Sequence, residues 1–256
     1  MNKQQLLSIY TKEQRIEAKH PGWQRIVTEF TVRNVSTLGE KGFVIYSELN
    51  EKNVHSVIDQ EIEYFKSISQ PFEWKYFDYD QPSNLKELLS EKGFTIDEPE
   101  ALLVLDIMSK EDLLGMKIGP EIVRVTDDKG IDELVKLEDQ IWNVSHAELG
   151  ERLKRDLKND PNHVFIYAVI IDGKVVSGAW MYLHKGTSFG SLWGGSTLPD
   201  YRGRGIYTSL IAIRAQDAKE KGFSLLTVDA SPMSAPILQK RGFELLAYSY
   251  PCNSPD

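Results

Sequence analysis

The chain has 256 residues, 41% of them hydrophobic, so it is long and apolar enough to bury a substantial core. Its net charge of −8 argues against a nucleic-acid-binding protein that works by bulk electrostatics, and only a local pair, Arg202 and Arg204, points the other way. The single cysteine, Cys252, excludes an intramolecular disulfide, and with no Cys/His cluster around it we expect no metal site.

Two features of the sequence bear on location. Residues 1–15 are polar, with no apolar segment of the length a signal peptide needs. The longest apolar run, 164–171, is far shorter than the ~20 residues of a membrane span. We therefore expect a cytoplasmic protein that has neither a membrane nor a nucleic acid as its partner.

The first half alternates between helical and strand-like patterns. Apolar residues recur at helical spacing after Asn2 and after Asn53, and runs rich in β-branched and aromatic residues lie between them. The turn 38–42 separates two of these runs as in a hairpin. In chain order we expect a helix over 2–18, strands 25–35 and 43–49, a helix over 53–66, strand 74–79, a short helix from 82 to Gly93, and strand 101–108.

The second half restarts after residues 111–120, a stretch with two glycines, a proline and no strong periodicity, which we interpret as a domain boundary. Short glycine-containing connections at 172–173 and 185–186 are typical of antiparallel hairpins. The expected elements are strand 122–125, helices beginning near 127 and near 149, strands 164–171, 175–183 and 188–195, a helix from 205 to about 221, strand 223–228, helix 235–240 and strand 243–250.

The two halves end alike. A short helix followed by Gly-Phe and a strand occurs at 88–94 and again at 237–243. The similarity is a weak internal repeat. The alternative is that Lys-Gly-Phe is simply a common sequence at the end of a helix. We interpret it as a duplication.

Between a predicted strand and a predicted helix lies a turn rich in glycine and arginine, Thr197–Tyr207. Its glycines let the backbone approach a ligand closely, and the first N–H groups of the following helix lack intrahelical partners. Such a turn is typical of an anion site, and phosphate oxygens fit it. A plain solvated turn is the alternative, because a short glycine pattern alone is weak evidence.

In its order of elements and in two motifs, segment 121–252 resembles the GNAT N-acetyltransferase superfamily. The motifs are 199–205, similar to the phosphate-binding loop of the family, and 231–243, similar to its later helix motif. The resemblance implies acetyl-CoA as acyl donor, with its pyrophosphate on the N–H groups of 202–208, and an oxyanion donor in the main chain of Thr197 or Leu198. The implied cofactor-binding residues are Thr197, Leu198, Arg202, Gly203, Arg204, Gly205, Ile206, Tyr207, Thr208, Ser231 and Ser234.

By the same resemblance, the first half looks like a partial, degenerate copy. Its counterpart of the phosphate loop, 49–53, lacks glycine and carries a carboxylate at Glu51, which a pyrophosphate would meet unfavourably. We expect only the second half to bind CoA. The predicted fold is an α/β (α+β) tandem GNAT-like fold, with a mixed, mostly antiparallel sheet flanked by helices, a partial domain over 1–115 and a CoA-binding catalytic domain over 119–256.

Catalysis by this family needs a proton acceptor for the amine, an oxyanion donor and an acid for the thiolate. Strand 188–195 offers no acidic residue, so the candidate bases are Glu148, His146 and Asp229, each with a structural alternative: a solvated helix start for the first two and helix capping for Asp229. The position of the usual tyrosine acid is Leu238. Tyr207 is a further candidate, either as a hydroxyl donor or as a packed aromatic.

These features predict an N-acyltransferase that moves an acyl group from acetyl-CoA to the amine of a small molecule or a peptide. The alternative is a non-catalytic acyl-CoA-binding module, which Leu238 and the missing strand acid favour. We expect a monomer or a homodimer.

Overall fold

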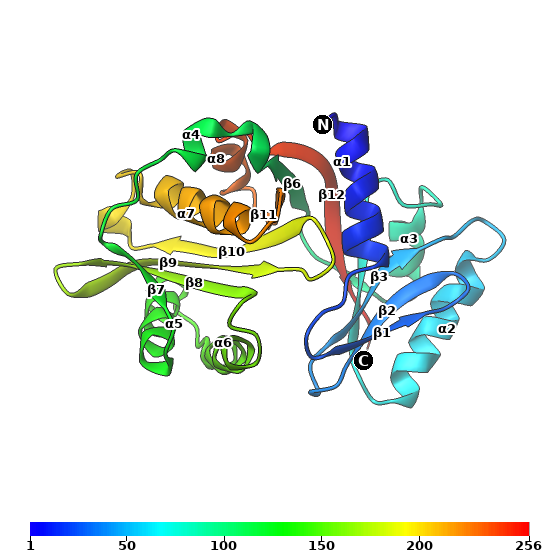
Figure 1. The fold of residues 1–256 in the computed structure, drawn as a ribbon. Coiled ribbons are helices and arrows are strands. Elements are labelled where there is room, and N and C mark those ends of the chain that lie inside the picture. Colours follow the sequence, from blue (N-terminus) through cyan, green and yellow to red (C-terminus); the bar gives the residue numbers. More distant parts are fainter. Residues whose placement is uncertain (256) are drawn as a thin grey trace. The chain divides into compact units, whose positions relative to one another are not determined.

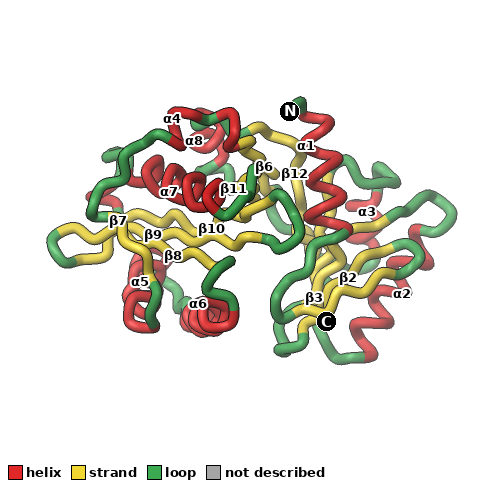
Figure 2. Tube along the Cα trace, in the orientation of Figure 1, coloured by secondary structure: helices red, strands yellow, loops and turns green. Residues whose placement is uncertain are grey.

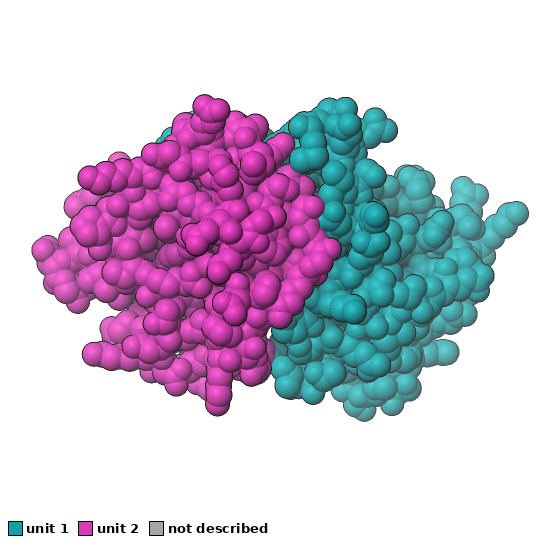
Figure 3. Space-filling model, viewed as in Figure 1, with its two compact units in different colours: residues 1–104, 229–256 teal, residues 105–228 magenta. Residues whose placement is uncertain are grey.

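The computed structural model describes residues 1–255 and divides into two compact units (Figure 3). One unit joins residues 1–104 with 229–256, and the other comprises residues 105–228. Helices and strands alternate along the chain in both units (Figure 2). The mixed α/β class and the mostly antiparallel sheet flanked by helices are as the sequence predicts.

The sheet of the first unit has the strand order β1-β2-β3-β4-β12-β6, with β5 paired to β12 (Figure 1). Neighbouring strands are antiparallel except β3 and β4, which are parallel and connected through a helix. The strands are β1 (Trp23–Val27), β2 (Thr31–Ser36), β3 (Gly42–Ser47), β4 (Phe72–Phe77), β5 (Thr95–Ile96), β6 (Glu100–Asp106) and β12 (Glu244–Asn253). The helices are α1 (Lys3–Tyr10), a π-helical turn over Thr11–Ile16, α2 (Val54–Ser67), α3 (Leu85–Glu91) and α8 (Ala235–Lys240).

Helix α2 covers the core of the first unit. Its positions Val54, Val57, Ile58 and Phe65 are buried, which is the helical spacing that the sequence predicts. The Phe65 ring stacks on Phe72 with the ring centroids 4.3 Å apart. Buried Cys252 belongs to the same core, so its role is packing.

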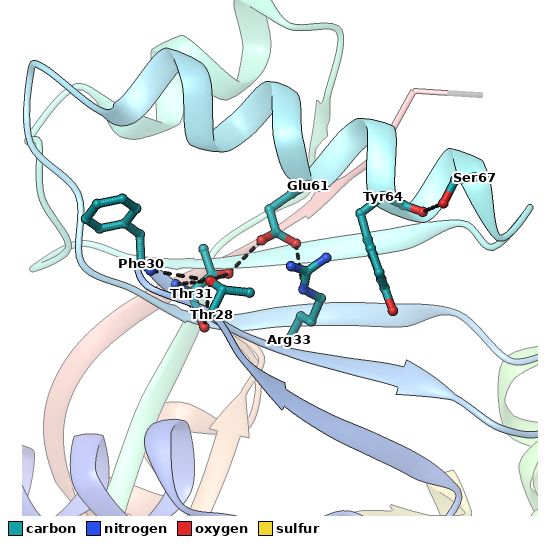
Figure 4. Close-up of polar contacts among 7 residues, drawn as sticks. All are labelled: Thr28, Phe30, Thr31, Arg33, Glu61, Tyr64 and Ser67. Atoms are coloured by element: carbon teal, nitrogen blue, oxygen red, sulfur yellow. Dashed lines mark hydrogen bonds and ion pairs between the residues drawn. The ribbon is translucent and has the colours of Figure 1, made fainter.

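A buried polar network lies beneath α2 (Figure 4). Glu61 accepts a 2.6 Å hydrogen bond from the Thr31 hydroxyl and lies 3.4 Å from Nε of Arg33. The Arg33 guanidinium in turn lies 3.8 Å from the centroid of the Tyr64 ring. A charged pair therefore sits within an otherwise apolar contact between helix and sheet.

The predicted strand 25–35 is wrong, because the chain turns within it. The Thr28 hydroxyl accepts hydrogen bonds from the N–H groups of Phe30 (3.3 Å) and Thr31 (2.9 Å), and this local turn separates β1 from β2. Threonine favours strands, so the composition of this segment predicts a continuous strand. In the structure the Thr28 side chain instead closes a turn.

The second unit has the strand order β11-β10-β9-β8-β7, with β10 and β11 parallel and the other pairs antiparallel. Helix α7 lies on one face of this sheet, and α5 and α6 lie on the other (Figure 1). The strands are β7 (Ile122–Val125), β8 (Val164–Ile171), β9 (Lys174–Leu183), β10 (Phe189–Thr197) and β11 (Leu225–Ala230), whose last two residues belong to the first unit. The helices are α4 (Glu111–Leu114), α5 (Asp128–Trp142), α6 (Ala147–Asn159) and α7 (Ile206–Glu220), with 3-10 turns at Ile107–Ser109 and Pro199–Tyr201.

The compact units do not follow the predicted domains 1–115 and 119–256. The last strand, β12, pairs with β4 and β6 of the first half of the chain, which places residues 229–256 in the first unit. The expected boundary 111–120 contains α4, whose end is held by the Gln216 side-chain amide through bonds of 3.1 Å to the Leu113 carbonyl and 2.8 Å to the Met116 carbonyl. The predicted domains 1–115 and 119–256 were drawn from a repeat in the sequence, not from compactness, and they stay a prediction. Over residues 1–255, no helix combines the length and the apolar character needed to cross a membrane.

Candidate functional site

The turn before α7 has an open, glycine-dependent backbone. Gly203 and Gly205 have φ angles of +74° and +81°, a conformation that side chains with a Cβ rarely adopt. A Cβ at either position would meet none of the described atoms within 4 Å. Both glycines are therefore required by backbone conformation, and the space beside them is free for a ligand.

The N-terminus of α7 presents unpaired amides. Gly205 is the N-cap residue, and across the described residues no side chain caps this helix. The N–H of Ser209 donates to the Gly205 carbonyl at 3.1 Å, so the amides of Ile206, Tyr207 and Thr208 precede the first bond of the helix. With the positive end of a helix of 15 residues behind them, these amides are groups of the kind that bind anions in proteins.

Two arginines brace the turn. Nε of Arg202 donates to the Thr197 carbonyl at 2.9 Å, and Nη2 of Arg204 donates to the Asp200 carbonyl at 2.8 Å. The Arg204 guanidinium lies 5.0 Å from the centroid of the Tyr201 ring. Through these hydrogen bonds the arginines fix the shape of the turn. Both side chains are exposed and also add positive charge beside the free amides.

Strand β10 is interrupted just before this turn. Gly194 and Gly195 have positive φ angles of 68° and 95°, and the register against β9 shifts between Gly194 and Ser196. The parallel pairing with β11 ends at Ser191 and Thr227, although β10 continues to Thr197. The last part of β10 is thus released from one neighbour and bulged against the other.

Of the two expected oxyanion donors, Leu198 has an engaged amide. Its N–H donates to the Val176 carbonyl at 2.9 Å, and its side chain is buried. In the conformation seen here this N–H is therefore not available for a second strong hydrogen bond, and the expectation that Leu198 supplies the oxyanion donor stays a prediction. The hydroxyl of Thr197 is within 2.8 Å of Ser177 Oγ, and the role of its main-chain N–H stays a prediction.

The corresponding loop of the first half is closed by its own side chains. The Asn50 carboxamide oxygen accepts from the N–H groups of Lys52 (2.9 Å) and Asn53 (3.3 Å), and the Asn53 oxygen accepts from the Asn50 N–H at 2.7 Å. These bonds occupy the amides of the two residues before α2, and the first amide of the helix, that of Val54, donates to the Asn50 carbonyl at 3.0 Å. This adds a physical reason, missed from sequence, for expecting the anion in the second half only.

Comparison with known proteins decides the family. The sequence model of the family described as "Acetyltransferase (GNAT) family" matches residues 131–243, which include the bulge, the turn and α7. Residues 131–243 belong to the GNAT acetyltransferase family. A search among curated proteins found no match.

Solved structures agree with this GNAT fold over nearly the whole chain. A GCN5-related N-acetyltransferase from Kribbella flavida matches with a TM-score of 0.68 at 15% identity, over 99% of this chain and 94% of that one. A tandem GNAT protein from the clavulanic acid biosynthesis pathway matches with a TM-score of 0.61 at 11% identity, over 94% and 86% of the two chains. A functionally unknown protein from Staphylococcus epidermidis matches with a TM-score of 0.64 at 12% identity, over 92% and 95%. At these identities the likeness concerns the fold, including its tandem form.

Tyr207 packs onto the bulge of the GNAT segment. A Cβ built on Gly195 would lie 2.5 Å from the Tyr207 ring, so the ring rests directly on the glycine backbone. Burial raises the pKa of the Tyr207 hydroxyl, so the phenol stays protonated at neutral pH. The packed-aromatic alternative thus describes its ring, and a role for its hydroxyl stays a prediction.

The two candidate bases near α6 have contrasting surroundings. Glu148 is exposed in the first turn of α6, with no hydrogen bond or ion pair to any residue in the described part of the chain. The His146 N–H donates to Oδ1 of Asp139 at 2.6 Å, and its ring Nδ1 lies 3.1 Å from the same oxygen. His146 therefore connects α5 to the start of α6, and the structure does not bring these two candidates together with the turn.

A buried carboxylate that sequence reasoning missed is Glu138 of α5. It is 3% exposed and accepts hydrogen bonds from the Ser196 hydroxyl (2.7 Å) and from Nε1 of Trp142 (3.0 Å). Burial raises the pKa of Glu138. Its signal in the sequence was available, because Glu138 shares the apolar face of α5 with Ile131 and Leu134, where a charge is unusual.

Asp229 lies in an ionic cluster of the first unit. Its Oδ2 is paired with Nζ of Lys75, which also lies 3.9 Å from Oε2 of Glu100. Burial, reinforced by the charge of Asp229, raises the pKa of Glu100 to about 7. Asp229 does not cap a helix, so its predicted alternative role is wrong, while its catalytic role stays a prediction.

Residues of the later motif are mainly structural in their contacts. The Ser231 carbonyl accepts from the N–H groups of Ser234 (3.1 Å) and Ala235 (3.0 Å), which forms the turn before α8. Leu238 is fully buried, so the usual tyrosine position contributes to the core. Within residues 1–255, no group of three or more His, Cys, Asp or Glu side chains is placed to hold a metal ion.

Proposed function

We propose that this protein is an acyl-CoA-dependent N-acyltransferase that binds acetyl-CoA at residues 202–208 and transfers the acetyl group to an amine. The observation that carries the proposal is the set of unpaired amides at Ile206, Tyr207 and Thr208 behind two open glycines. Membership of segment 131–243 in an acetyltransferase family supports acyl transfer as the reaction.

The chemistry follows from the parts of the turn. The pyrophosphate oxygens accept hydrogen bonds from the amides at the start of α7, and Arg202 and Arg204 add charge beside them. The acceptor nitrogen attacks the thioester carbonyl carbon, the carbonyl oxygen becomes an oxyanion, and collapse of this intermediate breaks the C–S bond. The amine loses a proton and the CoA thiolate gains one, so the products are an amide and CoA.

Tyr207 is the proposed proton donor to the thiolate. It follows the turn directly, and its phenol carries a proton at neutral pH. Replacing Tyr207 by Phe leaves the ring that packs on Gly195 and removes only the hydroxyl. If the proposal holds, Tyr207→Phe lowers turnover and leaves CoA affinity unchanged; unchanged turnover would assign Tyr207 to packing alone.

The test of the proposal combines binding with turnover. Calorimetric titration with acetyl-CoA measures the first step, and release of free CoA thiol over a panel of aliphatic amines, aminoglycosides and peptide N-termini measures the second. Binding with turnover supports the enzyme. Absence of acetyl-CoA binding would overturn the proposal.

A second candidate is a non-catalytic acyl-CoA-binding module that serves as a sensor. It is favoured by one observation, the buried Leu238 at the position of the usual acid. Its signature is acetyl-CoA binding with background thiol release for every amine of the panel, which contradicts the first candidate.

A further inference from the structure

The carboxylate of Glu138 has one oxygen that the protein leaves unused. Oε2 accepts from Ser196 and Trp142, whereas Oε1 is buried and has no hydrogen-bond partner among residues 1–255. A buried carboxylate oxygen without a donor is costly, so natural structures supply one from the protein, from water or from a ligand. The position of Glu138 decides which of these fits.

Glu138 lies at the functional end of the GNAT sheet. The Ser196 that it holds is the first paired residue after the bulge, opposite Gly178 of β9. The Ser196 carbonyl accepts a 2.7 Å bond from the Ser177 hydroxyl, which secures the same point from the neighbouring strand. The unused oxygen is thus fixed relative to the segment of β10 that leads into the proposed CoA turn.

One half-exposed indole, that of Trp142, contacts this carboxylate, and a second, that of Trp193, lies on the same face of the sheet with its N–H donating to Ser191 at 2.9 Å. The register opposes Trp193 to Trp180 and Ser196 to Gly178, and positions 178 and 180 share one face of β9, so Trp193 and Ser196 project on the same face of the sheet. Trp193 is 50% exposed, and Trp142, which touches Glu138, is 54% exposed. Exposed indole rings beside a carboxylate are the groups that proteins use to hold organic cations.

We propose that Oε1 of Glu138 receives the ammonium group of an aliphatic amine. The inference deepens the proposed function, on which it rests only for the role of this amine as the acyl acceptor. An ammonium group supplies the donor that Oε1 lacks and a positive charge for a carboxylate that is 97% shielded from water.

The charges around Glu138 agree with a cationic ligand. Asp139 adds a second negative charge at the neighbouring position, and it is 42% exposed. The ring of His146 faces Asp139, which holds it at 3.1 Å. No lysine or arginine pairs with Glu138 in the described chain, and the positive group that acts on its charge is the imidazole of His146.

Because Oε1 is buried, an amine reaches it only when neighbouring side chains move, and Trp142 is the exposed side chain that contacts this carboxylate. This residue ends α5, and the next, Asn143, has a left-handed backbone with φ of 55°. The Trp142 indole N–H is shared between Glu138 Oε2 (3.0 Å) and Ser196 Oγ (3.3 Å). An ammonium group on Oε1 lies beside this indole, so binding changes the surroundings of Trp142 and hence its fluorescence.

A purely structural role for Glu138 makes a different prediction. As a brace, it needs only an oxygen that accepts from Ser196, and a glutamine supplies that oxygen at nearly the same volume. As an ammonium site it needs its charge. The variant Glu138→Gln therefore separates the two roles, and Glu133→Gln, which removes an exposed charge from the same helix, is the matched control.

The experiment titrates the full-length protein with 1,4-diaminobutane at pH 7.5 by calorimetry, with 1,4-butanediol as the uncharged analogue. We expect saturable binding of the diamine only, weakened at least about tenfold in Glu138→Gln and by less than about twofold in Glu133→Gln. Equal affinity of Glu138→Gln and wild type, equal binding of the diol, or no saturable binding of the diamine overturns the proposal.

A second variant, Trp142→Phe, tests the proposal even if Glu138→Gln does not fold. In Trp142→Phe the Glu138 carboxylate is retained, so calorimetric binding persists, but the fluorescence change caused by the diamine is lost. A fluorescence change of full size in Trp142→Phe would place the amine elsewhere and overturn the proposal.

Failure of this site and failure of the proposed function are distinguishable. Diamine binding is measured without CoA, and acetyl-CoA binding is measured without an amine. Loss of the first with retention of the second removes the ammonium site and leaves the acyltransferase, whereas the reverse result keeps the site and removes CoA as its co-substrate.

Discussion

The Tyr207 ring lies against the backbone of Gly195 so closely that a Cβ at position 195 would approach it to 2.5 Å. The contact joins the first turn of α7, which is part of the proposed cofactor site, to the bulge of β10 that precedes this site in the chain. Gly195 also has a φ of +95°, so two independent constraints exclude a larger residue. The bulge and the start of the helix are therefore coupled through one glycine and one ring.

Replacing Gly195 by Ala tests this coupling. We expect a loss of about 2–4 kcal/mol in the free energy of unfolding, from backbone strain and from displacement of Tyr207, measured by urea denaturation. Gly173→Ala is the control, because its φ is +76° but no described atom lies within 4 Å of the new Cβ. It should cost only about 1–2 kcal/mol of strain. Equal losses in the two variants would show that the Tyr207 contact has no energetic weight.

The glycines of the turn have a different role, which binding reveals. Replacing Gly203 and Gly205 by Val forces both residues out of their left-handed conformation and fills the open space beside the amides. We expect acetyl-CoA affinity to fall at least about 100-fold, the equivalent of ~3 kcal/mol, while circular dichroism still shows a folded protein. Affinity that survives the double substitution would place the cofactor elsewhere.

The first half supplies the control for that result. Asn50→Ala removes the oxygen that occupies two amides before α2, so it should destabilise the protein by about 1 kcal/mol. Acetyl-CoA affinity should stay within about twofold of wild type, since the proposed site lies in the GNAT segment. A large change in affinity would mean that the first half also contacts the cofactor.

The position of the turn before α7 could be predicted from the sequence better than the contacts of the polar residues near it. Glycine spacing and the helix that follows are local signals, so the turn before α7 was correctly predicted, as were strands 122–125 and 164–171, while the anion site at 202–208 stays a proposal. The place of Glu138 on the apolar face of α5 was also visible in the sequence, but its partner was not, because Ser196 is distant in sequence and becomes a neighbour only through packing of α5 on the sheet. The pairing of Asp229 with Lys75 depends on long-range strand order in the same way.

The division into compact units shows the same limit. The element predicted near 244–253 is a strand, as expected. The periodicity of a sequence, however, does not say which strands pair with one another. Strand β12 lies between β4 and β6, so the end of the chain completes a sheet that begins more than 150 residues earlier, about the length of a domain. Local sequence patterns therefore predicted the helices and strands, whereas the pairing of the strands became known only from the structure.

Glu100 makes stability depend on pH in an identifiable window. Its pKa is raised by burial from 4.5 to about 7, so the folded state binds a proton more tightly than the unfolded state. Stability from this group is present below the unfolded pKa and is lost as pH rises toward 7. Because the side chain is 38% exposed, the expected loss is only about 1 kcal/mol. Urea denaturation at pH 5 and pH 8 should show this fall in wild type and a smaller one in Glu100→Gln; equal falls would contradict the assignment.

The ion pair beneath α2 should be costly to break and inexpensive to replace (Figure 4). Glu61 is 2% exposed and faces the Arg33 guanidinium, so Glu61→Ala leaves a buried positive charge with no counter-charge at that position. We expect a loss of about 3–5 kcal/mol in the free energy of unfolding. The double variant Glu61→Leu, Arg33→Met replaces both charges by apolar groups of similar size and should recover most of that loss. A double variant as unstable as Glu61→Ala would mean that the hydrogen bond from Thr31 to Glu61, rather than the charge pair, stabilises the contact between helix and sheet.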